Sequence, residues 1–155
     1  MFRDDERFAC ALRALDRRDF TGADAAFAEL LAKERLAEEE RAFLLNKRGV
    51  ARMGLKLPEL ARADFEASLK AHPGYPPALT NLGNMLLEEG RLEAAIANYE
   101  TAIAADPDYA IAYLNLGVAC KRAGRFGEAV RALRHAQRLE RRVSAGRFWR
   151  PTPRR

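Results

Sequence analysis

The sequence predicts an all-α protein built from stacked antiparallel helix hairpins, and three observations predict it. An Asn-Leu-Gly motif that begins at Asn81 returns at Asn115, a shift of 34 residues. Between these motifs the apolar residues recur at helical spacing rather than at the alternating spacing of strands. Glycine and proline interrupt the pattern at regular intervals, which divides the chain into segments of the length of short helices.

The clearest hairpin is expected between residues 76 and 109. Its first helix begins near Pro76 and ends before Gly90, because a glycine there interrupts the apolar pattern. Its second helix is expected from about Leu92 and ends before Pro107, because proline blocks helix continuation and disfavours helix just before itself. Two short helices joined by a tight turn form an antiparallel hairpin.

Small residues predict where the helices of each hairpin cross. A glycine inside a helix costs about 1 kcal/mol, so Gly83 and Gly117 require a packing reason. Gly83 and Ala95 are expected to let two backbones approach closely, and Tyr99 is expected to fill the wider gap beside them. Cys10 and Cys120 are assigned to core positions of the first and last hairpins, as free thiols.

The remaining helices follow from the same signals. The extra residues at 33–40 are assigned to a lengthened second helix, and Pro58 opens the fourth helix at its first position. From Val143 the helical pattern fails, and three possibilities stay open: an exposed apolar strip on the last helix, a cover formed by Phe148 and Trp149, or a partner. The other helices are expected at about 4–16, 23–40, 41–53, 58–71, 110–123 and 126–142.

The 34-residue period of paired amphipathic helices resembles the tetratricopeptide repeat. The unit at 76–109 matches that family at Leu79, Leu82, Gly83, Leu86, Ala95, Tyr99, Ala102 and Pro107. The units at 110–142 and 42–75 match less completely, because Arg141 replaces the proline and Arg48 and Arg52 replace apolar residues; the unit at 4–37 is degenerate. The resemblance implies a right-handed α-solenoid over residues 1–142. The composition of residues 143–155 predicts a basic Pro/Arg-containing tail after it.

In that family the first helix of each hairpin lines a concave groove. Residues of this chain at those positions are largely apolar, which favours an amphipathic helix or an extended apolar segment as the ligand. Asn81 and Asn115 occupy equivalent positions, and their amides either bond a peptide backbone or join successive repeats. The cations with which some members hold a terminal carboxylate are absent, so that specificity is not carried over. The candidate lining comprises Asn46, Val50, Met53, Thr80, Asn81, Asn84, Leu87, Leu114, Asn115, Val118 and Lys121, with Phe8 and Leu12 in the first hairpin.

Charge is distributed unevenly along the chain. Between Lys121 and Arg155, twelve basic residues accompany two acidic ones, which gives that segment a charge of +10. Because the whole chain carries +5, residues 1–120 carry −5. An excess of this size favours an anionic partner. The candidate basic patch comprises Arg131, Arg134, Arg138, Arg142, Arg147 and Arg150.

Signals for catalysis are absent from the sequence. His72 and His135 lack partners at metal-ligand spacing, and the acidic runs at 38–40 and 88–89 are typical of helix surfaces. The glycines do not form a phosphate-binding loop, and no residue lies in a recognisable nucleophile setting. The sequence therefore predicts no enzyme, no cofactor and no metal site.

A protein-interaction module is the leading functional interpretation: an adaptor, co-chaperone or assembly factor that binds a peptide or helix in the groove. The alternative is binding of nucleic acid or another anionic surface through the basic C-terminal helix and tail, where arginines accompany Phe148 and Trp149. Self-association through the last helix is a third possibility. No membrane span is expected, and the lack of an apolar signal core predicts a cytoplasmic location.

Overall fold

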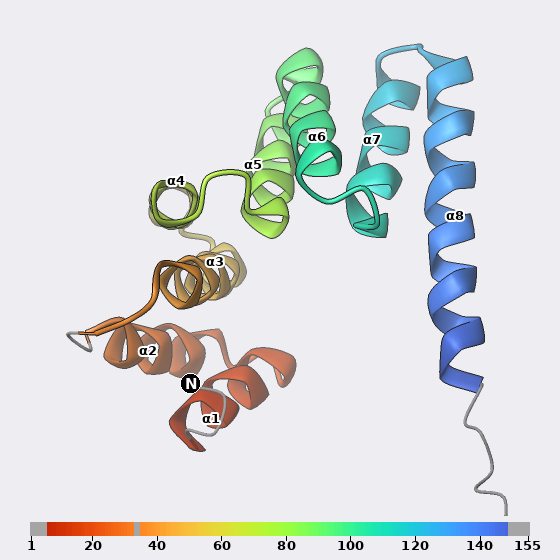
Figure 1. Ribbon diagram of the computed structural model, residues 1–155. Helices are drawn as coiled ribbons and strands as arrows, with labels where there is room; N and C mark the ends of the chain where they lie inside the picture. The colour runs from red at the N-terminus through yellow and green to blue at the C-terminus, as the bar shows by residue number, and fades with distance from the viewer. Residues whose placement is uncertain (1–5, 33–34, 149–155) are drawn as a thin grey trace, which may run out of the picture. The chain divides into compact units, whose positions relative to one another are not determined.

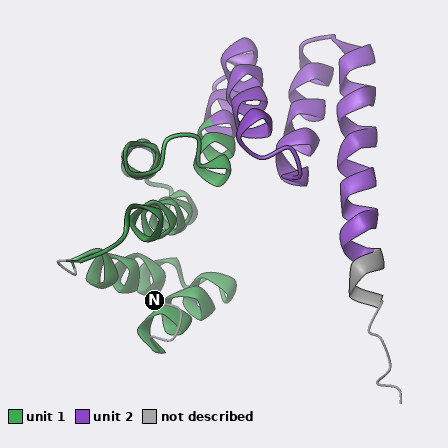
Figure 2. Ribbon diagram, viewed as in Figure 1, with its two compact units in different colours: residues 1–82 green, residues 83–155 purple. Residues whose placement is uncertain are grey.

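This computed structural model describes residues 6–32 and 35–148 of the chain, with side chains up to Ser144. Within those ranges the regular structure is entirely α-helical, as predicted (Figure 1). The chain divides into two compact units, residues 1–82 and 83–155, and the division falls inside α5 (Figure 2). The helices are α1 (Glu6–Asp16), α2 (Phe20–Leu31), α3 (Glu38–Gly54), α4 (Pro58–Ala71), α5 (Pro76–Glu88), α6 (Leu92–Ala105), α7 (Ala110–Arg122) and α8 (Phe126–Phe148).

Unit 1 consists of the α1–α2 and α3–α4 hairpins and the first residues of α5. Its core contains fully buried aromatic and aliphatic side chains, of which Phe27, Phe65 and Leu44 are among the largest. At the crossing of α3 and α4, a Cβ atom on Gly49 would lie 2.5 Å from the Phe65 ring. The close approach predicted for the repeat therefore exists here, and it leaves no room for a side chain at this glycine.

The connection between the first two hairpins differs from the prediction. The lengthened second helix is wrong, because α2 ends at Leu31 and α3 begins at Glu38. The acidic run at 38–40 lies in the first turn of α3, where the helix dipole favours negative charge. The Glu40 carboxylate also accepts a hydrogen bond from the Ala37 backbone N–H, at 3.3 Å. These residues therefore start the third helix instead of prolonging the second.

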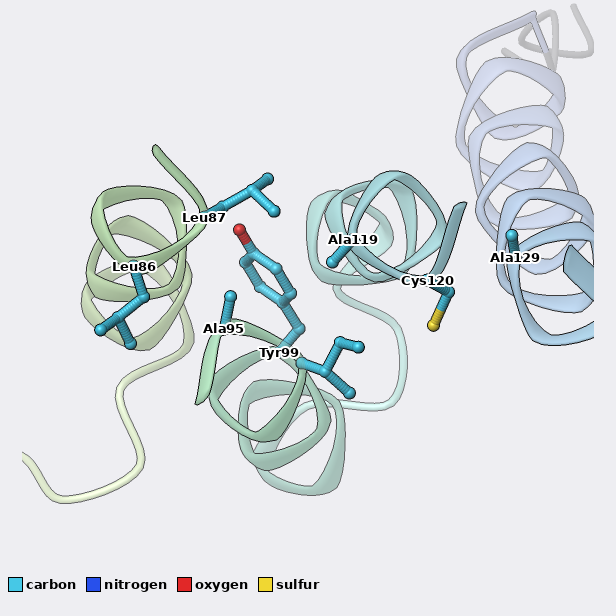
Figure 3. Packing of buried hydrophobic residues seen from close by; sticks show 8 residues of the cluster. Leu86, Leu87, Ala95, Tyr99, Ala119, Cys120 and Ala129 are labelled. Carbon is cyan, nitrogen blue, oxygen red and sulfur yellow. The ribbon is translucent and has the colours of Figure 1, made fainter. Parts of the chain in front are cut away.

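Unit 2 contains the rest of α5 and the helices α6 to α8. Its core is organised around Tyr99, which is completely buried between α5, α6 and α7 (Figure 3). A Cβ on Gly83 would lie 2.5 Å from the Tyr99 ring, and a Cβ on Gly117 would lie 2.6 Å from Leu133 Cγ. The prediction that these glycines mark close helix crossings is confirmed.

The last helix is longer than expected. α8 runs from Phe126 to Phe148 and extends beyond the N-terminal end of the antiparallel α7 (Figure 1), so the expectation that helical structure fails at Val143 is wrong. The physical reason is that the first residue unable to continue a helix in this segment is Pro151, eight residues later. Whether Phe148 or Trp149 covers this helix lies outside the described side chains.

Cys10 also departs from the prediction, because it is exposed, whereas Cys120 is buried as expected. In the repeat register, with Ala11 at the position of Gly117, Cys10 corresponds to Leu116. Leu116 packs against the core that α7 shares with the preceding hairpin. α1 is the first helix of the described chain, so the equivalent side of α1 has no preceding hairpin to contact.

Candidate functional site

The predicted groove positions divide into buried and accessible sets. Asn46 and Thr80 occupy the same repeat position and are only 4% and 3% exposed. The Thr80 hydroxyl donates a hydrogen bond to the Pro76 carbonyl at 2.8 Å, inside its own helix. Leu87 is 7% exposed and belongs to the core around Tyr99 (Figure 3). These three side chains are therefore packed inside the protein and are not accessible to a ligand.

The predicted asparagines connect successive first helices. In unit 1, Asn81 Nδ2 donates to Asn46 Oδ1 at 2.9 Å. In unit 2, Asn115 Nδ2 donates to Asn84 Oδ1 at 3.0 Å, and the same oxygen accepts a hydrogen bond from the Tyr99 hydroxyl at 2.8 Å. Of the two possibilities left open by the sequence, the structure shows the one in which the amides join repeats. Their spacings of 35 and 31 residues, each close to one period, were the signal for this pairing.

The accessible apolar residues of unit 2 gather on α7. Ile111, Leu114 and Val118 are 51%, 43% and 39% exposed, and their spacing places them on one side of the helix. We call these three residues the α7 row. Leu114 and Val118 belong to the predicted lining, whereas Ile111 does not. Lys121, also predicted, is exposed one turn after Val118.

The α7 row continues onto α8 through a shallow hollow of about 390 Å³. Leu114 lines it from α7, and Val130 and Leu133 line it from α8. Both α8 residues are large apolar side chains with substantial exposure, 46% and 36%. Sequence reasoning did not assign them to a site, although Val130 was recognisable as an apolar residue at the repeat position of Ile96. The hollow is also lined by Arg134, Ala136, Gln137 and Glu140.

In unit 1, the most exposed member of the predicted lining lies on α3. Met53 is 42% exposed, and Val50 is half-buried. Of the two residues predicted for the first hairpin, Phe8 is buried and Leu12 is half-buried. Phe8 packs beside Phe43, with the ring centroids 5.6 Å apart. Unit 1 therefore exposes less of its predicted lining than unit 2.

Three members of the predicted basic patch surround a second hollow, of about 550 Å³, between α7 and α8. Arg131, Arg134 and Arg138 line it together with Tyr113 and His135. The His135 ring stacks on Tyr113 with 4.1 Å between the centroids, and Arg138 Nη2 lies 3.1 Å from His135 Nδ1. His135 therefore belongs to an interhelical contact.

The other patch residues are distributed differently. Arg142 lies 3.4 Å from the Asp108 carboxylate, in an exposed ion pair. Arg147 lies in the last turn of α8, but its side chain is outside the described part of the molecule, as is the whole of Arg150. The structure thus brings together the patch residues from 131 to 138.

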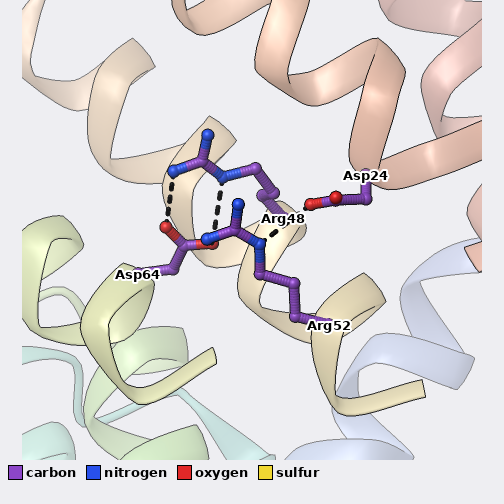
Figure 4. Close-up of polar contacts among 4 residues, drawn as sticks. All are labelled: Asp24, Arg48, Arg52 and Asp64. Carbon is purple, nitrogen blue, oxygen red and sulfur yellow. Dashed lines mark hydrogen bonds and ion pairs between the residues drawn. The ribbon is translucent and has the colours of Figure 1, made fainter. Parts of the chain in front are cut away.

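A buried charge network in unit 1 involves the two arginines that depart from the repeat pattern (Figure 4). Asp64 has a side chain only 3% exposed, and Arg48 forms two hydrogen bonds with its oxygens, at 2.6 and 3.0 Å. Arg52 Nη1 lies 2.9 Å from Asp64, and Arg52 Nε donates to Asp24 at 2.9 Å. The network connects α2, α3 and α4, which is a structural role.

Tyr99 and Cys120 in unit 2 are both buried and have shifted pKa values. Burial raises the pKa of Tyr99 to about 12; Arg122 lowers it and Glu88 raises it to smaller extents. Burial also raises the pKa of the Cys120 thiol, with a further contribution from Glu128. A raised thiol pKa disfavours the nucleophilic thiolate. Among the described residues, no group of three or more His, Cys, Asp or Glu side chains is arranged to hold a metal ion.

Comparison with protein families identifies the repeats. Three family profiles match the chain in overlapping segments: a tetratricopeptide repeat profile at residues 46–100, a TPR repeat profile at 83–124, and another tetratricopeptide repeat profile at 110–142. This chain is a tetratricopeptide-repeat (TPR) protein. The matches cover the second to fourth hairpins, where the sequence resemblance was strongest, and the all-α fold agrees with them.

Solved structures of other TPR proteins share this fold. The crystal structure of MamA is 21% identical with a TM-score of 0.70, over 87% of this chain and 77% of MamA. The first TPR domain of Spaghetti (RPAP3), bound to the HSP90 peptide SRMEEVD, is 20% identical with a TM-score of 0.62, over 66% and 81%. YrrB, a TPR protein with an unusual peptide-binding site, is 20% identical with a TM-score of 0.64, over 86% and 66%. At these identities the similarity establishes the fold. No helix in the described part of this TPR protein is long and apolar enough to cross a membrane.

Proposed function

We propose that this TPR protein is a protein-interaction module that binds a segment of a partner protein at the α7 row. The observation that carries the proposal is the row itself. Ile111, Leu114 and Val118 are each at least 39% exposed and lie on one side of a single helix. Contiguous exposed apolar surface of this kind marks interaction sites in soluble proteins.

The α7 row lies on a helix whose other side is tightly packed, and such an ordered helix suits a binding surface. The opposite side of α7 is anchored by Ala112, Ala119 and Cys120, which are at most 1% exposed. The Asn115–Asn84 hydrogen bond further ties α7 to α5. A surface that is already ordered loses little conformational freedom when a ligand binds, which favours affinity. Peptide complexes of other TPR proteins, such as the RPAP3 domain with its HSP90 peptide, show that this fold can present a peptide site.

Capture of the natural partner tests the proposal. The intact chain and the variant Leu114→Glu/Val118→Glu would be immobilised in equal amounts and exposed to extract of the native cells. We expect the charged pair to lose most of the captured protein, because carboxylates in an apolar contact must be desolvated. Leu60→Glu is the matched control, since Leu60 is a comparable aliphatic residue, 48% exposed, on α4 of unit 1.

Two results would oppose the proposal. Capture that is unchanged in the α7 variant, with native circular dichroism, would place the binding surface elsewhere. Capture that disappears after nuclease treatment would favour the alternative of nucleic-acid binding through Arg131, Arg134 and Arg138. A catalytic role is not proposed, because the row contains only aliphatic side chains.

A further inference from the structure

The repeat itself shows what an uncovered hairpin lacks. In unit 2, α7 packs over the α6 residues Ile96 and Tyr99, which are 3% and 0% exposed. The residues of α8 one repeat later are Val130 and Leu133, at 46% and 36%. Phe126, one repeat after the partly buried Leu92, is 65% exposed. The α6 side chains are thus buried because the first helix of the next hairpin, α7, covers them. The equivalent α8 side chains are exposed because no helix in the described part of the chain covers them.

The surface left open combines the α7 row with the α8 residues Phe126, Val130, Leu133 and Gln137, and we call it the terminal face. Its shape is set by a close helix crossing like that of the preceding hairpin, with Leu133 beside Gly117 as Tyr99 is beside Gly83. In unit 2 the equivalent surface receives an α-helix, α7. The packing of α7 on this equivalent surface therefore indicates what kind of ligand fits the terminal face.

We propose that the terminal face binds an amphipathic α-helix of a partner protein, in the position that the first helix of a following repeat would occupy. The inference rests on the proposed function and specifies its ligand. The ligand helix carries small and apolar residues on the bound side, as α7 does with Ala112, Leu116 and Ala119. Where α7 presents Asn115 to Asn84, the ligand presents an apolar residue, because Val118 occupies the position of Asn84.

The charged residues around the terminal face indicate which residues the ligand helix carries beside its apolar stripe. Arg134 and Glu140 line the hollow, and Lys121 and Arg141 are exposed one turn beyond Val118 and Gln137. Three cations and one carboxylate therefore border the apolar surface. Complementary charge steers association and excludes partners of the wrong sign. The ligand helix accordingly carries acidic residues beside its apolar stripe.

A second copy of this chain fits the face poorly. In head-to-tail stacking, α1 of the second copy would take the place of the following first helix. At the positions where α7 has Ala112, Leu116 and Ala119, α1 has the exposed residues Glu6, Cys10 and Arg13. Arg13 would also approach the cations of the face. In a two-fold pairing of α8 helices the cations Arg134 and Arg141 of each copy would outnumber the carboxylate of Glu140, and the net like charge repels.

The test uses a synthetic probe and the full chain. The probe is a lactam-stapled helix with the spacing of Ala112, Leu116 and Ala119, leucine in place of Asn115, and glutamates on its flanks. We expect saturable binding by fluorescence polarisation, weakened at least about tenfold by Val130→Glu. A matched probe with lysine flanks binds less well, and Arg134→Glu reverses the preference of the protein between the two probes. Leu60→Glu leaves both affinities unchanged.

The outcomes separate this inference from the proposed function. Absence of binding, equal affinity for the acidic and basic probes, or insensitivity to Val130→Glu would each overturn the inference. If partner capture requires the α7 row but tolerates Val130→Glu, the proposed function stands and the helix ligand does not. If sedimentation equilibrium shows dimers that Val130→Glu dissolves, a second copy covers the face and the inference is wrong.

Discussion

The α3–α4 hairpin of unit 1 and the α7–α8 hairpin of unit 2 occupy equivalent repeat positions but are held together by different chemistry. In unit 1, three of those positions carry the charged residues Arg48, Arg52 and Asp64. In unit 2, the residues 68 positions later are Leu116, Cys120 and Ala132, which are apolar and at least partly buried. The same pairing of helices is therefore reached by a satisfied charge network in one unit and by apolar packing in the other.

The turns of the hairpins differ in a parallel way. The residue with positive φ in the turn is Arg18 or Lys56 in unit 1, at 63° and 60°. In unit 2 it is Gly90 or Gly124, both at 75°. Lys56, Gly90 and Gly124 are 34 residues apart, so the repeat requires the backbone conformation. The comparison shows that the repeat conserves geometry within the chain while the residue types that achieve it vary.

The largest effect is expected from a substitution that breaks the charge network of unit 1. Asp64→Ala leaves Arg48 and Arg52 without the buried carboxylate that both contact, and we expect a loss of about 3 kcal/mol in the free energy of unfolding. Urea denaturation followed by circular dichroism measures it. The matched control is Glu93→Ala, which removes the exposed partner of Arg125 in unit 2 and should cost at most about 0.5 kcal/mol.

The triple variant Arg48→Leu/Arg52→Leu/Asp64→Ala sharpens this test, because it gives unit 1 the apolar character of unit 2. We expect it to recover most of the stability lost in Asp64→Ala, since replacing buried, mutually paired charges by apolar residues is often neutral. The remaining Asp24 has a partly exposed side chain. A triple variant as unstable as Asp64→Ala would show that apolar packing cannot replace the charge network in unit 1.

An intermediate effect concerns the aromatic residue at the crossing, which is Phe65 in unit 1 and Tyr99 in unit 2. Tyr99→Phe removes the hydrogen bond to Asn84 and should lower the free energy of unfolding by about 1 kcal/mol at neutral pH. Because the folded pKa of Tyr99, about 12, lies above its unfolded value of 10, the unfolded chain loses the proton first. The stabilising contribution of the Tyr99 hydroxyl to the free energy of unfolding is complete below pH 10 and declines as pH rises towards 12.

Denaturation curves between pH 9 and 11.5 would measure this decline, in buffers of equal ionic strength. The wild-type protein should lose stability with rising pH more steeply than Tyr99→Phe, whose phenylalanine does not titrate. Parallel curves for the two proteins would show that Tyr99 does not cause the alkaline loss.

The smallest expected effect concerns the turns. Lys56→Gly relieves the left-handed strain of a side-chain-bearing residue but increases the freedom of the unfolded chain, so we expect a net gain of about 0.5 kcal/mol. Gly90→Lys should produce the opposite change, and nothing lies within 4 Å of the Cβ it would add. Urea midpoints at constant m-value measure both. Changes of the same sign would show that the turns are not equivalent.

Most of the fold could be predicted from the sequence because its signals are local. The glycines at the crossings and the prolines that bound α4 and α6 act through backbone sterics within a few residues. The bounds of α4 and α6 were predicted within one residue for this reason. The errors lay where no strong local signal operates: the acidic run that starts α3 instead of ending α2, and the absence of any stop in α8 before Pro151.

The sequence by itself thus determined the repeat, its period and the places where helices must approach closely, because each depends on nearby residues and on steric limits. The exposure of each side chain was decided only by the tertiary structure. Leu87 and Leu114 are both leucines on a first helix, yet one is 7% and the other 43% exposed. Burial depends on which helix packs alongside, and that neighbouring helix is distant in the sequence from the residue it covers.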